Sequence, residues 1–224
     1  MYQGKKIVSM IPIKMNSERV KDKNIRPFFD GKPLVRFITE TVSKCKYFDA
    51  VYIYCSSEKI KKYIPDGVKF IKRPDFLDGN DRNCNDIIRE FMKVIDADIY
   101  SISHATAPFT LSTSIDKCVQ TVADGNKYDS AILVKKVQTF LWKKDGAINF
   151  DPQHFPRTQD LEPIYTETSG AHVFTREVFQ TYGCRYGKHP YFIEASEIEA
   201  MDIDTEEEML IAQAIYKYWK ENEQ

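Results

Sequence analysis

The chain has 224 residues, of which 42% are hydrophobic and 29% are charged, and its 32 basic residues nearly balance its 33 acidic residues. These values are ordinary for one substantial globular domain, and they exclude the basic excess of a typical nucleic-acid-binding protein. No apolar run approaches the ~20 residues that cross a bilayer, so we expect a single domain spanning residues 1–224 with no nucleic-acid and no membrane partner.

Apolar periodicity divides the first part of the chain into alternating strands and helices. The predicted strands are Lys5–Ile13, Ala50–Cys55, Val68–Ile71, Ile99–Ser103 and Ser130–Val137, and the predicted helices are Leu34–Cys45, Glu58–Ile64, Asn85–Ile95 and Ser112–Val122. Repeated strand–helix alternation is typical of a mostly parallel sheet with helices on both faces, a Rossmann-like α/β fold. Such sheets bind ligands at the carboxyl ends of their strands.

From about Gln138 the pattern changes to short apolar segments joined by longer loops. We predict short strands at Phe140–Trp142, Ile148–Phe150 and Gly170–Phe174, which together form a small mixed β extension over residues 138–174. Such an extension could be an arm, a lid or a dimer contact. A helix from Thr205 to about Trp219 closes the chain.

The five cysteines, Cys45, Cys55, Cys84, Cys118 and Cys184, are widely spaced and include no C-x-x-C pair. This spacing favours free thiols over disulfides or a zinc site. The residues before the first apolar run lack the cleavage pattern of a signal peptide. We therefore expect a cytoplasmic protein.

The loop after the first strand concentrates positive charge. It contains Lys14, Arg19, Lys21, Lys23 and Arg26, with Ser17 and Asn24 among them. It matches neither a dinucleotide-binding glycine motif nor a P-loop. Cations and short hydrogen-bond donors at a strand end suit a polyphosphate, although a solvated charged loop would have the same composition.

Two aspartates near the end of the chain, Asp202 and Asp204, flank a single residue. If this segment is a strand, both carboxylates point to the same side and could share a hard cation such as Mg²⁺ with a phosphate. The alternative is that Asp204 or Thr205 caps the last helix, with Glu207 or Glu208 completing a capping box.

A third candidate is the segment Arg157–Leu161, whose Arg157 and Gln159 could bind the carboxylate and hydroxyls of a sugar. By itself this segment reads equally well as a surface loop. The four histidines are scattered, and no G-x-S-x-G sequence supports a hydrolase triad.

Taken in order, these segments resemble the acylneuraminate cytidylyltransferase (CMP-sialic acid synthetase) family. Residues 11–25 fit the frame of its I-P-A-R-G-G-S-K-x-x-x-x-K-N-I opening, and Gly31–Leu34 and Arg73-Pro74 also match. Residues 104–109 occupy the place of its Q-P-T-S-P-L segment, and Arg157 to Tyr165 resemble its R-x-Q-D-L-P-x-x-Y segment. Its D-I-D-T close is intact at Asp202–Thr205.

The resemblance implies an enzyme that joins the CMP half of CTP to a 2-keto-3-deoxy sugar acid, with Mg²⁺ as cofactor and a homodimer as the assembly. Lys14, Lys23, Asp202 and Asp204 would be the catalytic residues. CTP would be bound by Lys14, Ser17, Arg19, Lys23, Asn24 and Arg73, magnesium by Asp202 and Asp204, and the sugar by His104, Arg157, Gln159 and Tyr165.

The sequence departs from the family pattern at several positions. Met15-Asn16 replace a glycine pair, Glu18 replaces a lysine, His104 replaces a glutamine and Glu162 replaces a proline. Arg19 or Lys21 could supply the charge that Glu18 lacks. A sialic-acid-like nonulosonate fits best as acceptor. The alternatives are a Kdo relative, a glycosyltransferase with an Asp-x-Asp metal site, and a nucleotide-binding protein without turnover.

Overall fold

The computed structural model describes residues 1–17, 19–125 and 127–222. Its centre is a seven-stranded sheet in the order β11-β7-β10-β6-β1-β4-β5. The strands are β1 (Ile7–Ile13), β4 (Ala50–Cys55), β5 (Lys69–Lys72), β6 (Ile99–Ile102), β7 (Ser130–Val137), β10 (Ile164–Thr175) and β11 (Pro190–Ala195). Only β10 runs antiparallel to its neighbours, so the prediction of a mostly parallel sheet is confirmed.

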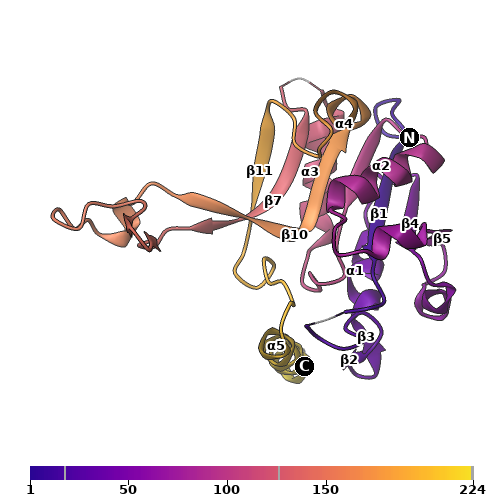
Figure 1. Cartoon of the computed structure of the whole chain (residues 1–224), viewed down its shortest axis with the longest axis horizontal. Coiled ribbons are helices and arrows are strands. Elements are labelled where there is room, and N and C mark those ends of the chain that lie inside the picture. Colours follow the sequence, from indigo (N-terminus) through magenta and orange to yellow (C-terminus); the bar gives the residue numbers. More distant parts are fainter. Residues whose placement is uncertain (18, 126, 223–224) are drawn as a thin grey trace.

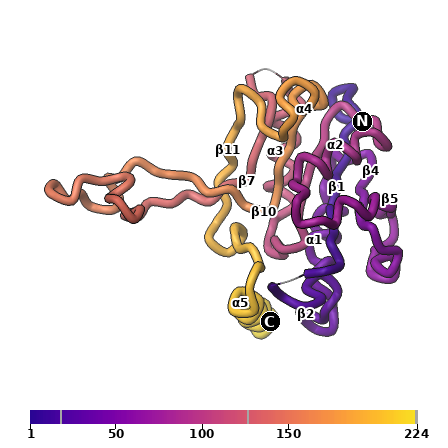
Figure 2. Tube along the Cα trace, in the orientation of Figure 1, coloured from indigo at the N-terminus to yellow at the C-terminus, as the bar shows by residue number. Residues whose placement is uncertain are grey.

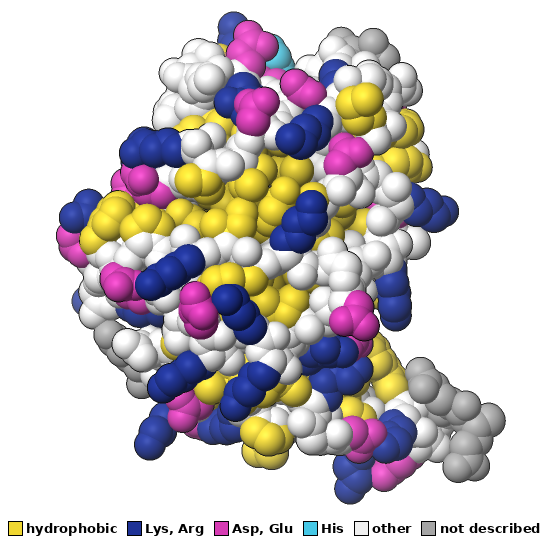
Figure 3. All heavy atoms as spheres, turned by 90° about the vertical axis from the view of Figure 1, so that its right-hand side faces the viewer, with side chains coloured by type: hydrophobic (Ala, Val, Ile, Leu, Met, Phe, Trp, Pro, Cys, Tyr) yellow, Lys and Arg dark blue, Asp and Glu magenta, His cyan; other side chains and the backbone are white. Residues whose placement is uncertain are grey.

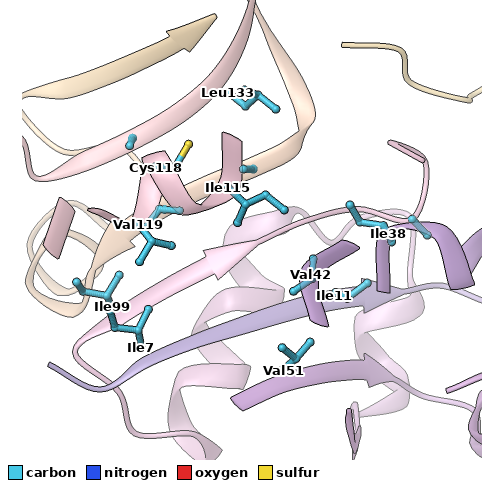
Figure 4. Packing of buried hydrophobic residues seen from close by; sticks show 14 of the residues in the cluster. Ile7, Ile11, Ile38, Val42, Val51, Ile99, Ile115, Cys118, Val119 and Leu133 are labelled. Atoms are coloured by element: carbon cyan, nitrogen blue, oxygen red, sulfur yellow. The ribbon is translucent and has the colours of Figure 1, made fainter. Parts of the chain in front are cut away.

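Helices cover both faces of this sheet, as the sequence predicts. They are α1 (Leu34–Ser43), α2 (Cys84–Val94), α3 (Ser112–Ala123) and α4 (Arg176–Tyr182). Successive strand residues point to opposite faces, so Ile7 and Ile11 of β1 pack with α1 and α3 (Figure 4), whereas Val8 and Met10 pack with α2 and α4. The buried apolar residues of the sheet thus belong to two cores, one on each side.

Several predicted boundaries shift, and several elements were not predicted. Glu58–Tyr63 is a 3-10 helix. The unpredicted elements include α4 and the edge strand β11. Most residues of β11 are exposed, so this strand lacks the buried alternation that marks a strand in sequence. Two further 3-10 helices cover Asp75–Asp78 and Thr158–Asp160, and β2 (Pro27–Phe29) and β3 (Lys32–Pro33) form a small hairpin before α1.

Residues 138–163, here called the arm, leave the sheet between β7 and β10 and extend away from the body (Figure 1, Figure 2). The strands expected at Phe140–Trp142 and Ile148–Phe150 are wrong, because the arm's hairpin joins β8 (Trp142–Lys143) to β9 (Gly146–Ala147). The ring of Phe140 instead packs on Phe155 at 4.3 Å between centroids and on Phe150 at 4.8 Å. Residues 164–174 of the expected extension lie in β10.

The last helix, α5 (Glu206–Asn222), packs beside the β2–β3 hairpin at the lower end of the molecule (Figure 1). Met209 and Ala212 of α5 join Phe28, Leu34 and Phe109 in a third apolar cluster. This contact brings the end of the chain against the loop that follows β1. No helix of the described residues is long and apolar enough to span a membrane.

The face formed around β5 carries charges of both signs. Figure 3 shows Lys and Arg side chains interspersed with Asp and Glu over a partly hydrophobic surface on this side. All five cysteines are free thiols in the structure.

Candidate active site

A cavity of about 370 Å³ opens at the carboxyl edge of the sheet, where β1 and β6 end. It is lined by Pro12, Lys14, Asn16, Ser17, Arg19, Val20, Lys23, Asn24, Asn80, His104, Ala105 and Thr106. The loop after β1 therefore supplies three cations to one concave surface. Six of the residues predicted from sequence lie together here: Lys14, Ser17, Arg19, Lys23, Asn24 and His104.

Lys14, the first residue after β1, lines this cavity and is held by two hydrogen bonds. Its Nζ donates to Asn80 Oδ1 at 2.8 Å, and its carbonyl oxygen accepts from Asn24 Nδ2 at 2.8 Å. Asn24 is buried, and its Oδ1 has no hydrogen-bond partner among the described residues. The loop is therefore folded back on the strand end, in contrast to a merely solvated charged loop.

Lys23 is a buried cation, with its side chain only 10% exposed. Its Nζ donates to the carbonyl oxygen of Ile203 at 2.7 Å and to Asp204 Oδ1 at 3.0 Å, and Arg19 lies 2.9 Å from the same oxygen. Burial opposes ionisation of Asp204, but the hydrogen bond and the charge of Lys23, together with Arg19, outweigh it and lower the pKa of Asp204. Asp204 is therefore ionised beside two cations.

Asp202 and Asp204 do not lie in a strand, so that expectation is wrong: residues 200–204 form an irregular segment. Met209 and Ile203 are held in the third apolar cluster, and this packing, not strand pairing, fixes the segment. Asp202 Oδ2 accepts from Ser169 Oγ at 2.8 Å, while its buried Oδ1 has no hydrogen-bond partner among the described residues.

The alternative that Asp204 serves only as a helix cap is resolved by the contacts at the start of α5. Glu208 Oε2 accepts from the backbone N–H groups of Asp204 and Thr205, and Thr205 Oγ1 accepts from the N–H of Glu208 at 3.2 Å. This is a capping box of Thr205 and Glu208. The Asp204 side chain takes no part in it and remains directed to Lys23 and Arg19.

Arg73 lies outside the described lining of this cavity. It follows β5, is 1% exposed, and its guanidinium forms an ion pair with Asp78. Asp78 borders a neighbouring polar cavity of about 440 Å³, which shares Asn16 with the first. The role of Arg73 in binding cytidine stays a prediction.

His104, at the end of β6, is kept neutral. Burial lowers its pKa to about 3, and the nearby His172 and Arg185 add to this effect while Asp204 opposes it. The nearby His172 is itself paired with Glu167. Glu167 accepts from Tyr186 Oη at 2.8 Å and lies 3.2 Å from His172 Nε2. The hydrogen bond with His172 is the main cause that lowers the pKa of Glu167 to about 2.

The other predicted sugar-binding residues are not brought to the cavity within this chain. Arg157 and Gln159 lie in the arm, where Arg157 is exposed and pairs with Asp160 through its Nε at 2.8 Å. Tyr165 is the second residue of β10, beside the arm, and donates to Glu194 Oε1 at 3.0 Å. Their roles stay predictions.

Asn80, Thr106 and Ser169 contact the site but were not predicted. Asn80 belongs to a polar loop after β5, and Ser169 to an irregularity in β10, so neither carries a sequence signal beyond its polarity. Of the two residues that could compensate for Glu18, Arg19 lines the cavity and the exposed Lys21 is absent from its described lining. Glu18 itself lies outside the described residues.

The sheet order and the position of the cavity define a nucleotidyltransferase-like α/β fold. It is similar to the structure of a CMP:2-keto-3-deoxy-manno-octonic acid synthetase complexed with CTP, with a TM-score of 0.71 and 17% identity over 95% of this chain and 99% of that one. It is also similar to a 4-diphosphocytidyl-2C-methyl-D-erythritol synthase from Anaerococcus prevotii, with a TM-score of 0.68 and 13% identity, covering 96% and 97% of the two chains.

A family model described as Cytidylyltransferase matches residues 8–219. The chain therefore belongs to the cytidylyltransferase family, which confirms the family resemblance found in its motifs.

Among curated proteins, the chain is 24% identical to an N-acylneuraminate cytidylyltransferase of Oncorhynchus mykiss over 92% of its own length and 49% of that protein. It is 21% identical to a bifunctional pseudaminic acid cytidylyltransferase and UDP-sugar hydrolase of Helicobacter pylori, over 92% and 42% of the two chains. The chain thus spans about half the length of these relatives.

The neutral state of His104 predicts how stability depends on pH. An unfolded histidine binds a proton below about pH 6.5, whereas folded His104 does so only near pH 3. Between these values the unfolded chain holds more protons, so the free energy of unfolding falls as the pH falls, by at most about 1.4 kcal/mol per pH unit for this group. Urea unfolding of wild type and His104→Gln at several pH values in this window measures the effect.

We expect a shallower pH dependence in His104→Gln than in wild type. The control is His189→Gln, at an exposed position, which should keep the wild-type dependence. Equal slopes in wild type and His104→Gln would contradict the assignment.

Proposed function

We propose that this protein transfers the CMP group of CTP to the anomeric hydroxyl of a 2-keto-3-deoxy sugar acid and releases pyrophosphate. The observation that carries the proposal is the cavity at the carboxyl edge of the sheet, which has Lys14, Arg19 and Lys23 on its wall and the Asp202–Asp204 segment beside it. A negatively charged triphosphate needs such cations, and a hard metal ion needs such carboxylates.

The chain's own residues would act by binding and by neutralising charge. Lys14, Ser17, Arg19 and Lys23 would contact the phosphates, and Asn24 and Arg73 the cytidine. Lys23 is held in place by Ile203 and Asp204 before any ligand arrives. Fixed cations need little reorganisation as charge develops on the α-phosphate and on the departing pyrophosphate, and this preorganisation is what favours the reaction.

Asp202 and Asp204 fit a divalent cation such as Mg²⁺. Asp202 presents a buried oxygen with no described partner, and Asp204 is ionised. Oxygen donors of this kind suit magnesium, which is commonly held by one or two carboxylates together with substrate phosphates. When bound, magnesium would supply charge neutralisation at the phosphate oxygens.

A sialic-acid-like nonulosonate is the acceptor we favour. The neuraminate and pseudaminate relatives align with 92% of this chain, whereas an 8-amino-3,8-dideoxy-manno-octulosonate cytidylyltransferase of Shewanella frigidimarina is 31% identical over only 37% of it. Neutral His104 has one ring nitrogen that can donate a hydrogen bond to a sugar hydroxyl and one that can accept a hydrogen bond from it. A Kdo relative is the alternative acceptor.

The arm supports a homodimer. Trp142 and Phe155 both pack on the ring of Phe150 in the arm, yet their side chains are 61% and 64% exposed. In a dimer these rings would be covered, and Arg157, Gln159 and Tyr165 of one subunit would complete the sugar site of the other. The free thiols agree with a reducing cytoplasm.

The first test is to incubate the purified protein with CTP, Mg²⁺ and a panel of nonulosonic and ulosonic acids, and to follow pyrophosphate release and product mass. We expect release with a nonulosonate, and loss of turnover in Asp202→Asn but not in Asp66→Asn, an exposed carboxylate elsewhere. CTP binding without release for any acid would favour a nucleotide-binding protein without turnover.

A second test separates Lys14 from the general charge of its loop. Lys14→Ala should weaken CTP binding by ten- to a hundredfold, because a charged hydrogen bond to phosphate contributes about 1.5–3 kcal/mol. Lys21→Ala removes the same charge at an exposed position away from the described cavity lining and should change binding little. Calorimetric titration with CTP measures both. An equal loss in the two variants would indicate a diffuse electrostatic effect.

A third test asks whether the arm acts on the partner's site. Asp202→Asn and Arg157→Ala should each be inactive as homodimers. Mixing them under exchange conditions should restore about a quarter of wild-type activity, because half the dimers are hybrids with one intact site of two. If Arg157 served its own chain, no hybrid site would be intact and mixing would restore nothing.

A further inference from the structure

The strand β10 is interrupted next to the site. Its register with β7 shifts between Glu167 and His172. Within this bulge, Thr168 Oγ1 donates to the carbonyl oxygen of Leu133 at 2.8 Å and accepts from the N–H of Gly170 at 3.2 Å. The bulge is therefore closed by its own hydrogen bonds, and bulges of this kind re-aim side chains near active sites.

Tight packing at Gly170 and a hydrogen bond with His104 also hold the bulge in place. A Cβ atom at Gly170 would lie 2.5 Å from Thr110 Oγ1 and 2.9 Å from Leu133 Cδ2, so the backbone packs tightly there. The carbonyl oxygen of Ser169 accepts from the N–H of His104 at 2.9 Å. Ser169 is thus attached to the cavity wall, and its hydroxyl has a defined position.

That hydroxyl donates to Asp202 Oδ2 at 2.8 Å. The next residue along the chain is held independently: the N–H of Ile203 donates to the carbonyl oxygen of Thr106 at 2.8 Å, and the Ile203 carbonyl accepts from Lys23. The backbone and one carboxylate oxygen of this segment are therefore both fixed, while Asp202 Oδ1 is buried with no described partner.

A hydrogen bond made only for stability does not account for this arrangement. Leaving a buried carboxylate oxygen without a partner costs more free energy than leaving a hydroxyl without one, because the carboxylate carries charge. A carboxylate with one oxygen bound to a fixed hydroxyl and the other left over is the arrangement seen around metal ligands, whose outer partners orient them.

We propose that Ser169 is a positioning residue for the metal site: it holds Asp202 by Oδ2 so that Oδ1 is available to a divalent cation that accompanies CTP. This inference rests on the proposed function. The β10 bulge would then set the orientation of the Asp202 carboxylate. This residue lies in an irregular segment, so no strand geometry orients its side chain.

The test uses Mn²⁺ as the probe, titrated into the full-length protein with CTP, with free Mn²⁺ followed by electron paramagnetic resonance. Ser169→Ala should weaken Mn²⁺ binding about tenfold, the size of effect typical for an outer-shell partner of a metal ligand. Ser169→Thr retains a hydroxyl and should keep an affinity near that of wild type. CTP affinity in the presence of a chelator should be the same in all variants.

The matched control is Ser101→Ala. Ser101 lies on the neighbouring strand β6, and its buried hydroxyl has no described partner. It should leave Mn²⁺ affinity unchanged, and circular dichroism verifies folding of each variant. If Ser169→Ala does not fold, Ser169→Cys, with a weaker donor, should give an intermediate affinity.

Mn²⁺ affinity in Ser169→Ala equal to that of Ser101→Ala, with normal turnover, would overturn this inference and leave the proposed function intact. Absence of Mn²⁺ binding and of turnover in the wild type would overturn both. A loss of affinity in Ser169→Ala that Ser169→Thr restores supports the positioning role, because a structural defect alone would not follow the presence of the hydroxyl.

Discussion

The buried ammonium of Lys23 is the interaction on which the candidate site depends. It joins the loop after β1 to the segment before α5, since Nζ donates to Ile203 and Asp204, which lie 180 and 181 residues further along the chain. A buried cation is costly unless it is paired and hydrogen-bonded. The loop and the carboxylate segment therefore take up their positions together. An ion pair from Arg26 to Glu206 at 2.8 Å reinforces the same junction.

A second constraint comes from the antiparallel strand in an otherwise parallel sheet. Because β10 enters between β6 and β7, its bulge lies beside the carboxyl end of β6, where His104 is. The strand thereby supplies both the hydroxyl that contacts Asp202 and the buried His172 near His104, which is paired with Glu167. A strand running parallel to β6 at that place would begin at the opposite edge of the sheet, away from the cavity.

The arm extends away from the body and lies outside the described lining of the cavity. Its rings pack on one another, with Phe140 at the centre, yet Trp142 and Phe155 remain exposed among charged and polar side chains. Large exposed apolar patches mark interaction sites. The proposed dimer would account for the distance between the cavity of a single subunit and Arg157 and Gln159, which the resemblance assigns to the sugar.

The sequence by itself determined the alternation of strands and helices, the charged loop after β1 and the ordered motifs of the family, because these depend on local periodicity and on residue type. β4 and β7 begin and end where periodicity predicts. Only the tertiary structure decided that Asp202 and Asp204 lie in an irregular segment, that Thr205 and Glu208 form the helix cap, and that Ser169 reaches Asp202. These depend on contacts between residues far apart in the chain, and no local pattern encodes which distant partner a carboxylate will meet.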